Sequence, residues 1–400
     1  MIVLAGGDIV LPDRVLPGGS LLVEGTRIAS VEPGPADPAG AVRIDVTGCY
    51  VVPGFIDVHV HGVERIDTLD GGEAIAAIAA RLPRYGVTAF CPTTVACAPA
   101  DLAAVLLQVR HARLSPAPDS ARVLPAHLES NFINPEYRGA QPATCLRLPD
   151  DRRAPLHGTP DREFSARDIL DTIAGARADV GIVTLAPELP GGLELVRALV
   201  GQGHRVSMGH SGASYDEAIA AIEAGARHAT HLFNRMTPMA HRAPGLPGAV
   251  LAREEVAAEL ICDGYHVHPA MCRVALRAKG TAGIMAITDG TAGSGLMPGS
   301  QASLGGRSIR VTDHAAVLDD GTLAGSTLTM DGAFSTIVST LGLSIEDATA
   351  LCSTTPARQL GLAGLGVIAA EATADLVVLD RTFRVVRTFI DGREVYRRDN

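Results

Sequence analysis

The chain has 400 residues, of which 47% are hydrophobic, 20% charged and 4% aromatic, and its mean hydropathy is +0.21. This length suits one large barrel or two to three domains, and the hydrophobic fraction predicts a globular fold. A formal net charge of −10, few aromatics and no Trp argue against nucleic-acid binding and against attraction to anionic lipid.

Cysteine spacing and the length of apolar runs indicate the compartment. The seven Cys residues are irregularly spaced, which fits neither a disulfide framework nor a CxxC zinc site and favours a reducing cytosol. No leader-like segment opens the chain, and apolar runs such as residues 74–80 are shorter than the ~20 residues that a membrane span needs. We therefore expect a cytoplasmic protein that binds neither membranes nor nucleic acid.

Both ends of the chain show short β-rich runs separated by turn signals. Residues 1–4, 20–25 and 27–31 have this pattern, as do residues 375–379 and 385–390. The pair Asp391-Gly392, between Ile390 and Arg393, is a type I′ hairpin signal directly after the last run. We predict a small β-sandwich domain built from residues 1–52 and 358–400.

The middle of the chain alternates short apolar strands with helix patterns, which favours a parallel sheet with crossover helices. The predicted strands end at or near His59, Thr93, Glu129, Pro187, His210, His231, Asp263 and Asp289. Ser165, Ser214 and Ser344 each precede an acidic residue by three positions, which is close to the capping-box pattern of a helix start. Eight such units predict a (β/α)8 TIM barrel over residues 53–357, and we expect residues 290–318 to form a loop and a small hairpin over its mouth.

Histidines and acids follow the predicted strands. In Asp57-Val58-His59-Val60-His61, residues i and i+2 share one face of a strand, so His59 and His61 should point the same way. Because the C-terminal ends of barrel strands converge on one face, six residues should meet there. They are His59, His61, Glu129, His210, His231 and Asp289. This set suits one or two divalent ions, Zn²⁺ first, with Fe²⁺, Co²⁺ or Mn²⁺ as alternatives.

The remaining histidines receive a structural interpretation. Six are expected on helix faces or in loops: His111, His157, His204, His228, His241 and His314. His127 shares a strand face with Glu129, and we expect it to orient that carboxylate. The only Lys, Lys279, lies in a helical stretch, which excludes a carboxylated lysine as a bridge between two metals. Glu129 would then be the bridge.

Several motifs occur in a characteristic order along nearly the whole chain. They are HxH at 59–61, His-Leu-Glu at 127–129, Gly-His-Ser at 209–211, Ala-Thr-His-Leu-Phe-Asn at 229–234, Asp-Gly-Tyr-His at 263–266, Thr-Asp-Gly-Thr at 288–291 and Gly-Ser-Thr-Leu-Thr-Met at 325–330. This set resembles the amidohydrolase superfamily and, more narrowly, its family of N-acetylglucosamine-6-phosphate deacetylases. The resemblance implies metal-dependent deacetylation of N-acetylglucosamine 6-phosphate to glucosamine 6-phosphate and acetate.

The resemblance also implies residue roles. Glu129, His210 and His231 would bind the hydrolytic metal, and Asp289 would be the general base and then the acid. His59 and His61 match a second metal position that some members retain. The positions implied for the substrate are Ala140, Gln141, Asn234, Arg235 through its backbone, Arg242, His266, Leu323, Ala324 and Gly325. In the family the arginine matching Arg242 comes from the neighbouring subunit, which implies a homodimer.

Elementary chemistry supports these roles. A bound divalent ion lowers the pKa of water to about 7, which makes a nucleophile available at neutral pH. Asp289 beside it could take a proton and pass it to the departing amine. In a chain of net charge −10, the forked guanidinium of Arg242 is the kind of local cation that a sugar phosphate requires.

The sequence departs from the family pattern in three places. Ser130-Asn131 replaces Gly-Pro after the Glu, and Val63-Glu64-Arg65 stands where the family commonly has glycines. The third change is Gln141, which replaces a His that polarises the acetyl carbonyl. A neutral amide cannot donate a charge-assisted hydrogen bond, which is roughly twice as strong. Either the rate is lower, or a second ion at His59 and His61 takes over this role, or the substrate has changed.

Two alternatives stay open beside this reading. One is an amidohydrolase for another N-acetylated amino sugar, such as N-acetylgalactosamine 6-phosphate or an unphosphorylated sugar, or for an N-acyl amino acid or cyclic ureide. A phosphate-free substrate would be insensitive to Arg242→Ala. The other alternative is a barrel that lost catalysis and serves in assembly, which should lack ligands or Asp289, and none is missing.

Overall fold

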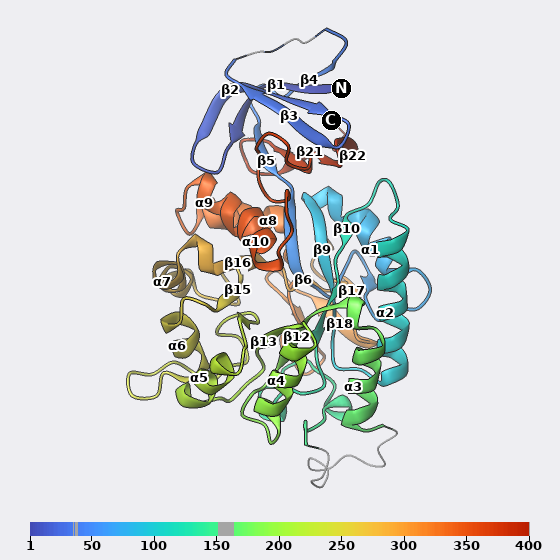
Figure 1. Cartoon of the computed structure of the whole chain (residues 1–400), viewed down its shortest axis with the longest axis vertical. Coiled ribbons are helices and arrows are strands. Elements are labelled where there is room, and N and C mark those ends of the chain that lie inside the picture. The colour runs from blue at the N-terminus through green and yellow to red at the C-terminus, as the bar shows by residue number, and fades with distance from the viewer. Residues whose placement is uncertain (35, 37–38, 151–163, 400) are drawn as a thin grey trace.

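The two ends of the chain meet in one mixed β-sheet, and the middle of the chain forms a barrel beneath it (Figure 1). The computed structural model describes residues 1–34, 36, 39–150 and 164–399, so His157 lies outside the described residues. Within the described residues, no helix is both long and apolar enough to cross a membrane.

The terminal sheet has eight strands in the order β22-β21-β20-β5-β1-β2-β3, with β4 paired to β1. Their bounds are β1 Ile2–Val10, β2 Val15–Glu24, β3 Arg27–Glu32, β4 Val42–Asp45, β5 Tyr50–Pro53, β20 Leu376–Leu379, β21 Val385–Ile390 and β22 Arg393–Arg397. Asp391 and Gly392 join β21 to β22 with φ of 49° and 73°, the left-handed values that a type I′ turn needs. The predicted terminal β domain and its hairpin are confirmed.

Eight parallel strands make the barrel, in the order in which they occur along the chain. They are β6 Phe55–Val60, β9 Val87–Thr94, β11 Ala126–Glu129, β12 Val180–Leu185, β13 Arg205–Met208, β14 His228–Ala229, β15 Ala257–Ile261 and β16 Ile284–Ile287, and β10 Arg122–Val123 also pairs with β9. A parallel bridge between Val60 and Gly290 connects the first strand to the segment after the last one. The barrel predicted from the sequence is confirmed.

Helices surround the barrel (Figure 1). Their bounds are α1 Ala74–Arg81, α2 Pro99–Leu114, α3 Ala166–Gly175, α4 Gly192–Gly201, α5 Tyr215–Glu223, α6 Gly245–Ala252, α7 Pro269–Lys279, α8 Met330–Ser339, α9 Ile345–Thr349 and α10 Thr355–Leu360. Ser165 and Ser214 form complete capping boxes with Asp168 and Glu217. The hydroxyl of Ser344 accepts a hydrogen bond from the Asp347 amide, so all three predicted helix starts are confirmed.

The terminal sheet adjoins the end of the barrel where the strands begin. Only Gly54 separates β5 from β6, and a Cβ at Gly54 would lie 2.1 Å from Oγ1 of Thr88, so this junction needs glycine. The C-terminal strand ends therefore face away from the terminal sheet (Figure 1). The exact domain boundaries, 52/53 and 357/358, stay a prediction.

Two small sheets lie beside these strand ends. They are β7 Gly62–Val63 with β8 Ile66–Asp67, and β17 Gln301–Leu304 with β18 Arg307–Val311 and β19 Ala316–Val317. The predicted hairpin after the last barrel strand thus has a third strand. Leu304 at the end of β17 lines the cavity described below, which brings this small sheet to the barrel mouth.

Apolar side chains from several barrel strands pack together in the barrel. One buried cluster contains Ile56, Val58, Ala89, Ile182, Ile261, Met285 and Ile287 from five barrel strands. Polar side chains are also buried in the barrel strands, among them His59, His127, Glu129, Thr184 and Glu259. Apolar packing and burial thus exclude water from around these polar groups.

Candidate metal centre and substrate cavity

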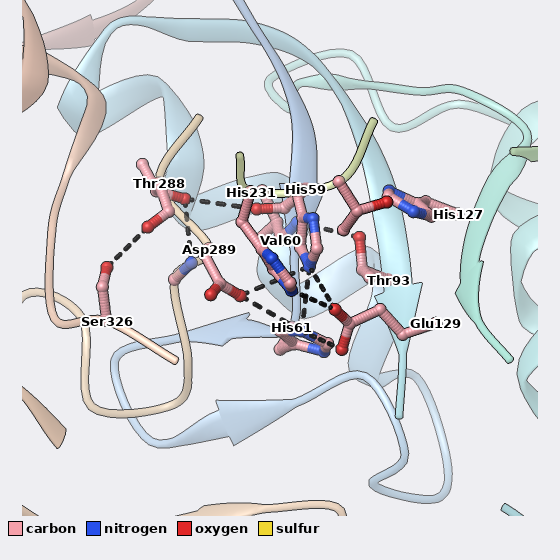
Figure 2. A network of polar contacts seen from close by, with 12 residues as sticks. His59, Val60, His61, Thr93, His127, Glu129, His231, Thr288, Asp289 and Ser326 are labelled. Carbon is pink, nitrogen blue, oxygen red and sulfur yellow. Dashed lines mark hydrogen bonds and ion pairs between the residues drawn. The ribbon is translucent and has the colours of Figure 1, made fainter. Parts of the chain in front are cut away.

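Three of the predicted site residues stand just beyond barrel strands in the left-handed backbone region. The φ angles are 48° at His210, 30° at His231 and 49° at Asp289. Such angles are uncommon for residues other than glycine, and strained positions of this kind concentrate at functional sites. In Figure 2 the side chains of His231 and Asp289 point toward Glu129 and the two histidines of the HxH motif.

One group of ligand atoms is formed by Glu129, His210 and His231. Oε1 of Glu129 lies 3.0 Å from Nε2 of His210 and 2.8 Å from Nε2 of His231. The two Nε2 atoms are 3.1 Å apart, and all three side chains are buried. Two imidazole nitrogens and one carboxylate are a donor set that Zn²⁺ and similar divalent ions accept.

A second group is formed by His59, His61 and Asp289 (Figure 2). The Nε2 atoms of His59 and His61 are 3.1 Å apart, and Oδ1 of Asp289 lies 3.3 Å from each of them. Oε2 of Glu129 lies 3.5 Å from Nε2 of His61. Glu129 therefore presents one oxygen to each group, and all six predicted residues meet at one place.

Two of the histidine rings, those of His210 and His59, make hydrogen bonds through Nδ1, the nitrogen that points away from the other ligand atoms. These bonds show that the ligand set fits a cation. Nδ1 of His210 donates to the carbonyl oxygen of Tyr137 at 2.8 Å, and Nδ1 of His59 donates to the Glu259 carboxylate at 2.9 Å. When neutral, each ring therefore carries its lone pair on Nε2, where it faces other lone pairs. Such an array is repulsive unless a positive charge lies among the atoms, so the donor set fits one or two divalent ions.

The pKa values indicate the same demand for positive charge. Burial raises the pKa of Glu129. The electrostatic attraction of His210 and hydrogen bonds with His210 and His231 outweigh this effect and lower the pKa well below its usual range. Burial lowers the pKa of His61 and His231, yet hydrogen bonds and charge from Glu129 and Asp289 raise them to about 10 and about 9. The carboxylates are thus ionised at neutral pH and draw protons or metal cations to the rings.

These groups form one wall of a cavity of about 470 Å³. Its lining includes His61, Glu129, His210, His231 and Asp289, together with Ala140, Gln141, Asn234, Arg235, His266, Leu323 and Gly325 from the predicted substrate positions. Two predicted substrate residues are not among the lining residues. Ala324 is fully buried behind its neighbours, and Arg242 lies exposed beyond the cavity of its own chain.

Gln141 is fixed against Glu129. Its Oε1 accepts a hydrogen bond from the Ala96 amide at 2.7 Å, so the side-chain nitrogen must point the other way. That nitrogen donates to Oε2 of Glu129. Gln141 therefore contacts the carboxylate that faces both groups of ligand atoms.

His266 presents a buried ring nitrogen to the cavity. Its Nδ1 lies 2.6 Å from Oδ2 of Asp263, and its Nε2 has no hydrogen-bond partner among the described residues. Burial lowers the pKa of His266, but the hydrogen bond and charge of Asp263 outweigh this effect and raise it. A protonated His266 would offer its Nε2 hydrogen to an anionic or hydroxyl group in the cavity.

Three buried or partly buried carboxylates that were not predicted as site residues support the site. Asp57 accepts a hydrogen bond from the Thr288 hydroxyl at 2.6 Å, next to Asp289. Glu188 accepts from Asn134, Ser211 and Gly212 and so joins the loops after β11 and β13. Glu259 contacts His59 and the His231 amide. The signal for Glu259 was an acidic residue inside the apolar run Ala257–Ile261, because buried acids normally have a partner.

Two histidines are placed differently from the expectation. His127 bonds the Val58 carbonyl and the Thr184 hydroxyl, and within the described residues its ring makes no hydrogen bond to Glu129. The expectation that it orients Glu129 directly is therefore wrong. His228 belongs to β14 and is fully buried, so its assignment to a helix face or loop is also wrong.

The sequence matches the model of the Amidohydrolase family over residues 50–395. It is 36% identical over 407 residues to N-acetylglucosamine-6-phosphate deacetylase of Mus musculus, covering 98% of this chain and 94% of that one. It is 33% identical over 389 residues to the enzyme of the same name from Bacillus subtilis (strain 168), covering 96% of this chain and 94% of that one.

A solved structure from Mycobacterium smegmatis is also similar. It is a mutant of N-acetyl-D-glucosamine-6-phosphate deacetylase in complex with N-acetyl-D-glucosamine 6-phosphate, 31% identical to this chain with a TM-score of 0.87. The match covers 98% of this chain and 99% of that chain.

Proposed function

The chain belongs to the amidohydrolase family, and on this premise we propose that it hydrolyses the acetamide bond of N-acetylglucosamine 6-phosphate. The products are acetate and glucosamine 6-phosphate. The observation that carries the proposal is the position of Glu129, whose two oxygens face two groups of histidine nitrogens at the wall of one cavity. Relatives with this activity match the chain over nearly its full length.

The roles of the ligand atoms follow from their chemistry. We propose that Glu129, His210 and His231 would hold a divalent ion and that His59 and His61 would hold a second one, with the other oxygen of Glu129 facing that pair. A divalent ion bound by such groups supplies Lewis-acid chemistry, because it lowers the pKa of water to about 7 and polarises carbonyl groups. Zn²⁺ is the first candidate for this mixed nitrogen and oxygen set.

Asp289 is proposed as the residue that moves protons. Its carboxylate lines the cavity beside the two groups of ligand atoms. Burial raises its pKa, but the charges of His59, His61 and His231 and a hydrogen bond with His61 lower it below the usual value. Asp289 is therefore ionised at neutral pH and can accept a proton from the attacking water. The same carboxyl then donates that proton to the departing amine nitrogen.

Gln141 is proposed to act at two places. One hydrogen of its amide nitrogen is directed to Glu129, and the second is available on the cavity side, where Gln141 is a lining residue. This hydrogen can be donated to the acetyl carbonyl oxygen of the substrate. Because the donor is neutral, its contribution is about half that of a charged imidazolium.

The sugar phosphate is proposed to lie at the end of the cavity lined by Asn234, Arg235 and His266. His266 has a buried ring nitrogen without a hydrogen-bond partner among the described residues for this purpose, and Arg235 would contribute its backbone. Arg242 is proposed to complete the phosphate site of the neighbouring subunit in a homodimer, since it is exposed and does not line its own cavity.

The direct test is acetate release by purified, metal-loaded protein. We expect turnover of N-acetylglucosamine 6-phosphate, with lower kcat/KM for N-acetylgalactosamine 6-phosphate and for unphosphorylated N-acetylglucosamine. A preference for either of the other two sugars would make that sugar the assigned substrate. Gln141 in place of the expected histidine would then be explained by the change of substrate. Absence of turnover on all three would overturn the substrate class.

A further inference from the structure

We propose that Glu259 is a positioning residue that holds His59 with its Nε2 lone pair toward His61 and Asp289, and that ties this group to His231 of the other group. The inference rests on the proposed function insofar as His59, His61 and His231 bind metal ions. It adds a carboxylate that lies outside the motifs quoted from the sequence, and it gives that carboxylate a role in metal affinity.

The geometry of Glu259 is specific. The residue lies in the middle of β15 and is fully buried. Its Oε2 atom lies 2.9 Å from Nδ1 of His59 and 3.2 Å from the backbone nitrogen of His231. A backbone amide can only donate, and a carboxylate can only accept, so both bonds run toward Oε2. The proton of the His59 ring is thereby placed on Nδ1, which leaves the lone pair on Nε2.

This arrangement determines where His59 can bind a cation. Nε2 of His59 lies 3.1 Å from Nε2 of His61 and 3.3 Å from Oδ1 of Asp289. A carboxylate behind a metal-binding imidazole fixes the ring orientation and raises the basicity of the ligand nitrogen. Because the same oxygen also accepts the His231 amide, a displacement of Glu259 would disturb a residue from each group.

A rival interpretation makes Glu259 itself a metal ligand, together with His59 and His127. The ligand atoms of these three residues lie within 4.8 Å of one another. However, Nδ1 of His127 lies 3.0 Å from the carbonyl oxygen of Val58, which can only accept, so this nitrogen carries a proton. It therefore has no lone pair to offer on the side that faces Glu259.

The other nitrogen of His127 is also used. Nε2 of His127 accepts from the Thr184 hydroxyl at 2.7 Å, Thr184 accepts from Thr230 at 2.7 Å, and Thr230 accepts from Ser207 at 2.6 Å. Because Nδ1 of His127 carries the proton, Nε2 must accept. Each hydroxyl has only one hydrogen to donate, so the direction of every hydrogen bond in this series follows. His127 thus belongs to a network of hydroxyl groups inside the barrel. The cluster of His59, His127 and Glu259 therefore supports His59 and is not a separate metal site.

The fold does not need a charge at this position. Oε1 of Glu259 has no hydrogen-bond partner among the described residues, with Nδ1 of His127 at 3.6 Å and Nε2 of His228 at 3.8 Å. A buried carboxylate with an unpaired oxygen destabilises a protein. A residue that costs stability and contacts two candidate ligands has the signature of a group retained for function.

Metal binding tests this role without relying on turnover. Metal-free wild-type protein and Glu259→Gln would be titrated with Co²⁺, with the visible absorption spectrum and equilibrium dialysis as readouts. We expect the wild type to bind two ions and Glu259→Gln to bind the second ion about 10- to 100-fold more weakly. Glu259→Leu, which removes both acceptors, should weaken it further, so affinity should fall in the order Glu, Gln, Leu.

A thermal measurement separates positioning from a purely structural role. Since Gln has the same shape without the buried charge, metal-free Glu259→Gln should melt at or above the wild-type temperature. Asp375→Asn is the matched control, because Asp375 is a buried carboxylate directly before β20 of the terminal sheet, away from the ligand atoms. This control should bind Co²⁺ as the wild type does.

Two results would overturn the inference. One is a Co²⁺ affinity in Glu259→Gln equal to that of the wild type, whether one ion or two bind. The other is a melting temperature of metal-free Glu259→Gln that falls as far as that of Glu259→Leu, since this would make the residue a structural support. Failure of the wild type to release acetate would refute the proposed reaction and leave these metal titrations unaffected.

Discussion

Nε2 of His231 lies 2.8 Å from Oε1 of Glu129, although 102 residues separate the two in the chain. Glu129 ends β11 and His231 follows β14, so the contact exists only because parallel barrel strands end on the same side. The carboxylate is shared with His210 and faces His61 through its other oxygen. The barrel thus places one carboxylate between the two groups of histidines that are proposed to bind metal.

Replacing Asp289 with Asn should remove proton transfer and preserve the shape of the cavity. We expect kcat for acetate release to fall by about 10²- to 10⁴-fold, the usual contribution of a general acid or base. The ion held by Glu129, His210 and His231 should remain, as measured by metal analysis of the same sample. A variant that keeps kcat within about tenfold of the wild type would assign proton transfer to another residue.

Replacing Gln141 tests its two proposed contacts. Gln141→Ala should lower kcat by about 10- to 100-fold, because it removes a hydrogen bond to the ionised Glu129 that is worth roughly 1.5–3 kcal/mol and a donor for the substrate carbonyl. Gln141→His should stay near wild-type activity if the second ion compensates for the missing imidazole. Both are to be compared at equal metal content. A large gain in the fully loaded Gln141→His protein would count against that compensation.

Metal affinity should depend on pH in a defined direction. The pKa values of His61 and His231 are raised to about 10 and about 9, so both rings are protonated at pH 7 and must lose a proton to bind metal. Affinity should therefore rise from pH 6 to pH 9. Calorimetric titrations with Zn²⁺ in buffers of different ionisation enthalpy should report about two protons released at pH 7.

The metal-free protein should show the opposite trend in stability. A histidine with a raised pKa stabilises the fold fully below its unfolded pKa of 6.5, and this contribution is lost as the pH rises through the folded value. The melting temperature of chelated protein should thus fall between pH 6.5 and pH 10. Affinity and melting temperature that are both independent of pH in this range would contradict the assignment of His61 and His231.

Subunit mixing tests whether Arg242 acts in the neighbouring subunit. Arg242→Ala should lower kcat/KM for the phosphorylated sugar by about 10²-fold, because truncating one partner of a charge pair costs 2–5 kcal/mol, and leave the unphosphorylated sugar unaffected. Mixed dimers of Arg242→Ala and Asp289→Asn would contain one intact site. Refolding the two variants together should therefore restore about a quarter of wild-type activity if half of the dimers are mixed.

The outcome distinguishes two arrangements. Recovery of activity requires that Arg242 from the Asp289→Asn subunit reach the intact Asp289 of its partner. If Arg242 served its own chain, neither subunit of the mixed dimer would have a complete site, and mixing would restore nothing.

The barrel and the six site residues were predictable from local patterns. Apolar runs, the capping serines and the turn Asp391-Gly392 determine local geometry, and the barrel rule then brings the strand ends together. His59, His61, Glu129, His210, His231 and Asp289 could be selected because each stands where a strand ends.

The supporting layer was not predictable in the same way. Glu259 contacts His59 from 200 residues away, and His127 contacts Thr184 from 57 residues away. Such partners depend on how strands far apart in the sequence come together in the barrel: β11 pairs with β12, whereas β6 and β15 are not paired. No local period encodes either relationship. His228 was missed because β14 has only two residues, too few to show the alternation that reveals a strand.

The most direct test of the metal centre is anomalous X-ray diffraction from active protein crystals at the zinc absorption edge. The account predicts a peak within bonding distance of Oε1 of Glu129 and Nε2 of both His210 and His231, with a second peak beside His59 and His61 at full loading. Fully active crystals without any anomalous peak among these atoms would contradict it.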